Sequence, residues 1–292
     1  MPSFHSEAVS YCRWLTRGSH SNFVTALRLL PRSQQEAMEV VYAFCRAVDD
    51  VVDRAEPGGG SGGAERAKQQ LQRWRKELAD CAAGFPTHPI AVALQPVAER
   101  YQIPLRHFEV LIDGVEMDLR PRRYATFEEL KVYCEHVASV VGLISVRVFG
   151  CRHPAAERYA QSLGIALQLT NILRDLKTDV EQDRVYLPQE EMARFGYSEA
   201  DLAASRTSDA FRKLMAFQYD RAREFFRQAE QALKESRERR RLLPAQIMAA
   251  VYTSLLSRME QIRYDVFSQR VSVSRQQQLW IAARLWAGGV FS

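Results

Sequence analysis

The 292-residue sequence lacks the features of secreted, membrane-spanning and zinc-binding proteins. Its five cysteines are odd in number, and none has the paired spacing of a disulfide framework or a zinc site. No secretory signal peptide opens the sequence, and no run of about 18 apolar residues could span a bilayer. These absences predict a protein of the reducing cytoplasm.

The charge balance excludes little by itself, because 40 Lys and Arg residues face 35 Asp and Glu residues. This mild excess is not the footprint of a nucleic-acid-binding protein, and no nucleic-acid partner is predicted. The basic run from Arg237 to Arg241 is typical of a solvated turn. A helical adaptor or nucleic-acid-binding protein acting through this run is the rival hypothesis. It predicts salt-sensitive polyanion binding and indifference to substitution of Asp49 or Asp175.

Helical periodicity covers most of the chain, and no segment has the pattern of a strand. Apolar spacing and start signals predict helices over 31–53, 64–83, 89–101, 104–118, 126–144, 154–180, 210–236, 244–269 and 274–286. With 47% hydrophobic residues the chain can bury a sizeable core. We therefore predict one all-α domain over residues 1–292.

Glycines mark one loop and two close approaches in this pattern. The segment 57–63 is predicted to be a flexible loop, and Gly59–Gly63 formally matches a nucleophile elbow around Ser61. That motif needs a strand before it, whereas a helix precedes this one, so the linker interpretation is favoured. Gly142 and Gly164 lie inside predicted helices, where glycine costs about 1 kcal/mol relative to alanine. A neighbouring helix or a ligand is therefore expected to pass close to both.

Two helices carry stripes of oxygen-bearing side chains. Asn171, Asp175 and Asp179 are spaced four apart and share one face of a largely apolar helix. Asp49 and Asp53 repeat this spacing near the end of an earlier helix. Each stripe alone is typical of surface salt bridges, which contribute little. Two such stripes in apolar helices predict one shared cation site instead.

The ligand types indicate which cation this site would hold. Oxygen ligands without neighbouring His or Cys favour Mg²⁺, or Mn²⁺, over zinc or copper. None of the six histidines has Glu three residues before it, which disfavours a di-iron bundle. Mg²⁺ is commonly shared with substrate phosphates, and Arg46, Arg174 and Arg184 could bind phosphate oxygens directly. A diphosphate substrate is therefore predicted.

Three sequence blocks also resemble the signatures of the squalene/phytoene synthase family. They are Phe44 to Asp53, Tyr133 to Ala138, and Gln168 through Arg184 to Pro188. The similarity runs from about Tyr11 to Gln269, with the blocks in the family order. It implies an isoprenoid-synthase bundle of helices around a central cavity, and an enzyme that joins two allylic prenyl diphosphates head to head.

The resemblance also implies roles for individual residues. By position, the metal-site residues are Asp49, Asp53, Asn171, Asp175 and Asp179, with Tyr133 as the catalytic tyrosine. Arg46 and Arg174 match diphosphate contacts. Further candidates for substrate binding are Ser19, Ser21, Phe23, Phe44, Gln168, Arg184 and Tyr186. Phe23 and Phe44 are expected to stabilise an allylic cation through their aromatic faces, and Tyr133 or released diphosphate could take the proton.

The product is the finest expectation. Asp113–Leu119 and Val137–Gly142 look most like the bacterial hopanoid branch, so we expect condensation of two farnesyl diphosphates to presqualene diphosphate. Squalene or dehydrosqualene formation, and phytoene synthesis from geranylgeranyl diphosphate, remain alternatives. Three departures from common family residues, at Asn22, Ser139 and Asp183, blur the branch. Because no dinucleotide fingerprint is present, a requirement for NADPH is not predicted.

The last predicted helix carries a second open alternative. Leu279 to Trp286 contains two tryptophans, a pattern that is more often helix packing than membrane contact. Peripheral membrane contact is therefore kept as the minority hypothesis. The oligomeric state cannot be inferred from the sequence.

Overall fold

The fold is described by a computed structural model over residues 4–17, 27, 29–53, 62–119 and 122–290. In these ranges the chain is built from helices and turns, with one isolated bridge between Arg123 and Val185. The all-α prediction is confirmed. No helix within the described ranges combines the length and the apolar character needed to cross a membrane.

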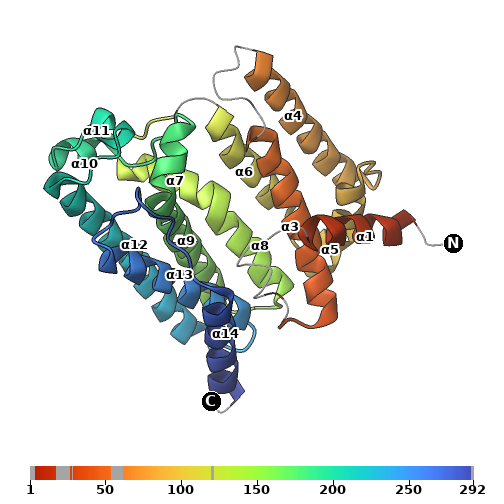
Figure 1. Cartoon of the computed structure of the whole chain (residues 1–292). Coiled ribbons are helices and arrows are strands. Elements are labelled where there is room, and N and C mark those ends of the chain that lie inside the picture. The colour runs from red at the N-terminus through yellow and green to blue at the C-terminus, as the bar shows by residue number, and fades with distance from the viewer. Residues whose placement is uncertain (1–3, 18–26, 28, 54–61, 120–121, 291–292) are drawn as a thin grey trace. The chain divides into compact units, whose positions relative to one another are not determined.

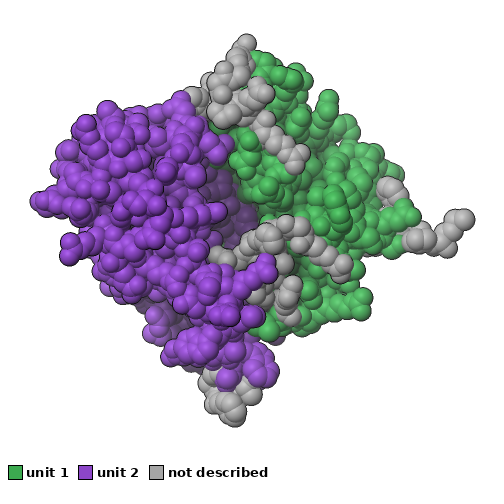
Figure 2. All heavy atoms as spheres, in the orientation of Figure 1, with its two compact units in different colours: residues 1–120, 143–152 green, residues 121–142, 153–292 purple. Residues whose placement is uncertain are grey.

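The chain divides into two compact units, coloured separately in Figure 2. Unit 1 comprises residues 1–120 and 143–152, and unit 2 comprises residues 121–142 and 153–292. The assignment of residues 1–292 to one domain stays a prediction.

Unit 1 is a set of helices around an aromatic core. Its helices are α1 (Phe4–Arg17), α3 (Arg32–Asp53), α4 (Gly62–Ala83), α5 (Pro89–Tyr101) and α6 (Leu105–Glu116), followed by the 3₁₀ helix Met117–Leu119. The buried ring of Phe44 in α3 makes edge contacts with Trp74 of α4 and Phe108 of α6, at centroid distances of 5.4 and 5.1 Å. Aromatic edge contacts of this kind add to area burial, so they fix how α4 and α6 pack on α3.

Unit 2 is organised around the 28-residue helix α9 (Pro154–Glu181), which packs along α12 (Asp209–Ser236), as Figure 1 shows. The other helices are α7 (Phe127–Cys134), the π-helix η2 (Glu135–Ser139), α10 (Gln189–Arg194), α11 (Glu199–Ala203), α13 (Leu243–Gln261) and α14 (Arg275–Val290). Helix α8 (Val140–Val148) continues η2 and crosses the boundary between the units.

The two interior glycines lie where backbones meet, as the sequence suggests. An added Cβ at Gly142 would lie 2.8 Å from the carbonyl oxygen of Ala160. At Gly164 it would lie 2.5 Å from Cα and 2.6 Å from N of Ser139. Both partners are backbone atoms that cannot rotate away, so these positions admit only glycine without a shift of the helices.

Several predicted boundaries differ from the structure. Gly62 and Gly63 open α4 rather than ending a loop, while residues 54–61 of the predicted loop lie outside the described residues. The helix predicted over 244–269 ends at Gln261, because Arg263 and Tyr264 adopt positive φ angles of 53° and 63°. The short helices α10 and α11 were not predicted, since each is too short for helical periodicity to be visible.

Candidate active site

The first acidic stripe lies on the last turns of α3 in unit 1. Asp49 and Asp53 both face solvent, and neighbouring Asp50 is paired with Arg46 across one turn at 2.8 Å. The predicted phosphate contact Arg46 is itself about half exposed, so its guanidinium is accessible to an incoming anion. The stripe therefore has one cation and several carboxylates on the same helix end.

Asp49 is the most perturbed carboxyl of this stripe. Withdrawal from bulk water raises its pKa to about 7, repulsion by Asp53 and Asp118 adds to the rise, and Arg46 opposes it. The residue still has an exposed surface, so this withdrawal is incomplete and ions can reach the carboxyl. Asp118 follows α6 and was not predicted as a site residue. This helix has an ordinary amphipathic pattern. Nothing in the sequence therefore indicates that Asp118 raises the pKa of Asp49.

The aromatic and serine candidates of unit 1 have different outcomes. Phe44 is fully buried among Trp74 and Phe108, which gives it a packing role in the core. Its contact with substrate stays a prediction. Ser19, Ser21 and Phe23 lie outside the described residues.

The second stripe lies on α9 in unit 2, where Asn171 shows a polar atom in need of a partner. Its Oδ1 atom is buried and finds no hydrogen-bond partner within the described part of the chain. Its amide nitrogen points to Oε1 of Gln168 at 3.5 Å, at the limit for a hydrogen bond. A buried acceptor without a partner costs about 1–3 kcal/mol, so this oxygen is placed for a ligand that donates or coordinates.

Arg174 and Asp175 form a forked pair beside this oxygen. The Arg174 guanidinium donates from Nε to Oδ1 of Asp175 at 2.9 Å and from a terminal nitrogen to the other oxygen. Burial by itself would lower the pKa of Arg174, but the bonds to Asp175 and to the Tyr252 hydroxyl raise it. Tyr252 on α13 was missed by sequence reasoning, since nothing marks one tyrosine in an apolar helix.

Three tyrosines cluster elsewhere in unit 2. The Tyr133 hydroxyl donates to the Tyr186 hydroxyl at 3.3 Å, and their rings stack with centroids 5.1 Å apart. Tyr124 adds a third ring, 5.8 Å from Tyr133 and 6.1 Å from Tyr186. All three are buried, so the predicted catalytic tyrosine lies in an aromatic setting with little water. Tyr124, which directly follows Arg122 and Arg123, was not among the predicted site residues.

The loop that carries Arg184 and Tyr186 is held by Arg123. Its guanidinium donates to the carbonyl oxygen of Asp183 at 2.8 Å and to the Asp183 carboxylate at 2.7 Å. A further bond to Glu199, at 2.8 Å, anchors Arg123 to α11. These contacts fix the backbone directly before Arg184, which the sequence predicts to bind phosphate.

Oxygen-bearing side chains offer the donors for a metal ion in this protein. Within the described ranges, no group of three or more His, Cys, Asp or Glu side chains could by itself hold a metal ion. The available donors are, in unit 1, the carboxylates of α3 and, separately in unit 2, the carboxylates of α9 and the Asn171 oxygen that lacks a hydrogen-bond partner. Such oxygen donors fit a hard divalent cation that keeps part of its ligand shell for phosphate and water.

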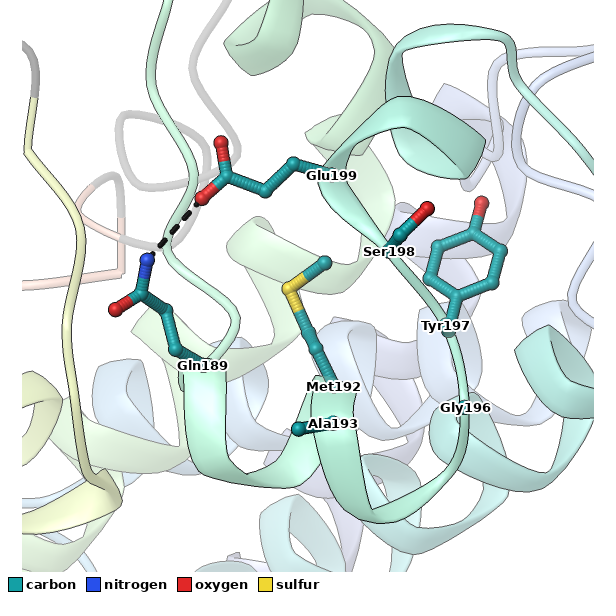
Figure 3. A pocket seen from close by; sticks show the side chains of 7 residues that line it. All are labelled: Gln189, Met192, Ala193, Gly196, Tyr197, Ser198 and Glu199. Carbon is teal, nitrogen blue, oxygen red and sulfur yellow. Dashed lines mark hydrogen bonds between the residues drawn. The ribbon is translucent and has the colours of Figure 1, made fainter.

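A shallow pocket of about 350 Å³ lies at α10 and α11, and Figure 3 shows its lining side chains. Gln189 and Glu199 close one side through a hydrogen bond of 3.2 Å, and Met192, Ala193 and Gly196 form part of the wall. None of the predicted site residues lines this pocket. It is therefore not the candidate active site.

Comparison with known proteins extends the geometric description. A family model described as squalene/phytoene synthase matches residues 16–277. The 15-cis-phytoene synthase of Synechococcus elongatus is 38% identical over 94% of this chain and 91% of its own length. The phytoene synthase of Arthrospira platensis is 34% identical over 93% and 90% of the two chains.

Two solved structures resemble this chain in fold. The crystal structure of squalene synthase HpnC from Alicyclobacillus acidocaldarius is 28% identical, covers 90% of this chain and 97% of its own, and superposes with a TM-score of 0.78. A dehydrosqualene synthase in complex with ligand is 24% identical with a TM-score of 0.84, which shows likeness of fold alone.

Proposed function

Because the chain belongs to the squalene/phytoene synthase family, we propose that it joins two molecules of geranylgeranyl diphosphate head to head, as a phytoene synthase does. The chain is a prenyltransferase of this family. The observation that carries the choice of product is the identity of 34–38% to phytoene synthases of Synechococcus elongatus and Arthrospira platensis, over nearly the full length of both chains.

This conclusion corrects the product expected from the sequence. The expectation of presqualene diphosphate from two farnesyl diphosphates in the hopanoid branch was wrong, because the curated relatives are named phytoene synthase. The error rested on short stretches around Asp113–Leu119 and Val137–Gly142. Short stretches of sequence include few of the residues that surround a substrate. Chain-length preference depends instead on the depth of the whole substrate cavity.

The diphosphate side of the reaction is assigned to the two acidic stripes and their arginines. Enzymes of this family bind diphosphate through a divalent metal, and we propose Mg²⁺, with Mn²⁺ as substitute. The proposed ligands are Asp49, Asp53, Asn171, Asp175 and Asp179. When bound, the metal neutralises charge on the leaving diphosphate.

The arginines complete this part of the site. Arg46 and Arg174 each have a carboxylate partner now, and phosphate oxygens would take over part of these guanidinium bonds. Gln168 beside Asn171, and Arg184 after the loop held by Arg123, are proposed to orient the diphosphate.

The carbon side of the reaction is assigned to the tyrosine cluster. Loss of diphosphate from one substrate leaves an allylic cation, whose C1 is attacked by the double bond of the second substrate. A proton then leaves and a cyclopropane ring closes, which gives a cyclopropyl diphosphate. To reach phytoene, this intermediate loses the second diphosphate, its ring opens by rearrangement, and a second proton leaves, so that the sequence balances without a reductant. The stacked rings of Tyr133 and Tyr186 offer π-faces to the cation in a dry setting. The Tyr133 oxygen, or the released diphosphate, would accept the proton. NADPH has no assigned site.

Purified protein is to be incubated with geranylgeranyl diphosphate or farnesyl diphosphate, with Mg²⁺ or Mn²⁺, with and without NADPH. Products are identified by mass spectrometry. We expect phytoene from the longer substrate, formed equally well without NADPH. Asp175→Asn should abolish turnover, whereas Asp209→Asn, an exposed acidic residue that pairs only locally with Arg212, should not. A preference for farnesyl diphosphate would refute the proposal.

A further inference from the structure

Helix α14, the last helix of unit 2 (Figure 1), carries large apolar side chains that are exposed. Leu279, Trp280 and Trp286 are 61%, 63% and 56% exposed, although residues of this size are usually covered. Spacings of three, four and seven residues place Leu279, Ala283 and Trp286 on one side of the helix. A second side, formed by Gln278, Ile281 and Leu285 at spacings of three, four and seven residues, is less exposed, and the helix packs on α13. The helix thus has one side attached to the protein and one uncovered.

The charged residues of the chain segment that carries this face have one sign. From Val266 to the C-terminus the sequence contains Arg270, Arg275 and Arg284, but no Asp, Glu or Lys. All three arginines are exposed. The Arg284 guanidinium lies 5.5 Å from the centroid of the Trp280 ring, so a cation and an indole are presented together. This combination suits a surface that is anionic outside and apolar beneath, because indole rings and arginines both favour the boundary between headgroups and acyl chains.

Two other uses of the face fit less well. With 16 residues and two arginines, α14 is too short and too charged to cross a bilayer. A second copy of the chain would bring like charges together, which is unfavourable. Three exposed side chains are also few for a stable dimer, which needs roughly 800 Å² buried on each partner. An anionic lipid surface has the complementary charge and needs no matching shape.

We propose that α14 docks in the plane of an anionic lipid surface, with Leu279, Trp280 and Trp286 entering the headgroup boundary and Arg275 and Arg284 binding lipid phosphates. This docking goes beyond the proposed function and does not depend on which prenyl diphosphate is used. It would place unit 2 at the phase into which a long hydrocarbon product partitions.

The test is flotation of the full-length protein with vesicles of two parts phosphatidylcholine to one part phosphatidylglycerol, compared with phosphatidylcholine alone. We expect binding to the anionic vesicles, reduced by high salt because the arginines act through screened charge. Trp280→Ala with Trp286→Ala should lower the partition coefficient about tenfold or more, and Arg284→Glu about fivefold or more, from the hydrophobic and basic contributions known for such helices.

The matched control is Trp14→Ala. Trp14 on α1 is 68% exposed, and so it is the same residue type in an equally open setting on another helix. This variant should float like the wild type. Tryptophan fluorescence adds a second reading, since the chain has only four tryptophans and Trp74 is buried. A blue shift on anionic vesicles should persist in Trp14→Ala and disappear in the double variant.

Three results would overturn the proposal. One is equal flotation of the double variant and the wild type, and another is an equal loss in Trp14→Ala. The third is a wild type that does not float but forms a dimer in sedimentation that the double variant breaks, which would make the face an interface between copies. Unchanged thermal melting and unchanged turnover of detergent-dispersed substrate keep misfolding apart from loss of docking, and turnover also tests the proposed function separately.

Discussion

Gly164→Ala is the substitution that most directly tests how α9 packs against η2. Two opposing effects can be estimated. Alanine favours a helix interior over glycine by about 1 kcal/mol. Against this, the new Cβ would lie 2.5 Å from Cα and 2.6 Å from N of Ser139, where ordinary contact needs more than 3.4 Å. The two helices would have to separate by roughly 1 Å, and overpacking of this kind typically costs about 1–3 kcal/mol or more.

The clash is expected to win, because its partners are backbone atoms. We expect the unfolding free energy to fall by about 1–2 kcal/mol, which lowers the melting temperature by several degrees. Since η2 begins two residues after Tyr133, turnover should also fall. Chemical denaturation and thermal melting measure the first effect, and the rate of product formation measures the second.

Gly63→Ala is the matched control, since this glycine is also helical but has nothing within 4 Å of an added Cβ. It should leave stability unchanged or raise it by up to about 1 kcal/mol. If Gly164→Ala were as stable as Gly63→Ala, the close approach of α9 and η2 would be wrong.

Three further predictions concern charged groups. Glu191→Ala removes the buried carboxylate that partly exposed Arg221 binds through both terminal nitrogens, so denaturation should show a loss of about 3 kcal/mol, the lower end for a broken buried pair. Asp183→Gly should change stability by less than about 1 kcal/mol, because the relief of positive φ offsets a weak exposed pair, whereas Arg123→Ala should cost more. Divalent metal binding, followed by calorimetry, should strengthen as pH rises through about 7, where the Asp49 carboxyl ionises, and Asp49→Asn should remove this dependence.

Much of the fold follows from patterns that are visible in the sequence. The helix over Pro89–Tyr101 was predicted to the residue, because it and the next predicted helix each begin with a proline, Pro89 and Pro104. In the structure Gln102 ends the helix with a φ angle of 51°. The interior glycines correctly indicated close helix contacts, since their cost in a helix has to be offset by packing. Helix-bounding prolines and interior glycines can both be recognised from a few neighbouring residues. A single sequence is therefore enough to detect them.

The π-helix and the site neighbours could not be predicted in this way. The segment Glu135–Ser139 keeps the apolar spacing of an ordinary α-helix, so the sequence does not mark it as a π-helix. Its particular contacts are with α9, where Gly164 approaches its backbone and the Ser139 hydroxyl donates to the carbonyl oxygen of Gln161. The contact between Arg174 and Tyr252 joins residues 78 positions apart in the numbering. Such contacts depend on tertiary packing, which periodicity does not report.

Asp183 shows how a departure in sequence acquires a physical reason. The family resemblance leads one to expect glycine here, and φ at Asp183 is +55°, a region that suits glycine and that aspartate tolerates better than most side chains. What aspartate adds is a carboxylate 2.7 Å from Arg123, which also binds the Asp183 carbonyl oxygen. The positive φ of Asp183 costs conformational energy, and the hydrogen bond between its carboxylate and Arg123 offsets part of this cost. The same bond holds the residue before Arg184 in place. A chain with glycine at this position gains freedom in the loop and loses that bond, so Arg123 and Asp183 should be substituted together when the role of this loop is tested.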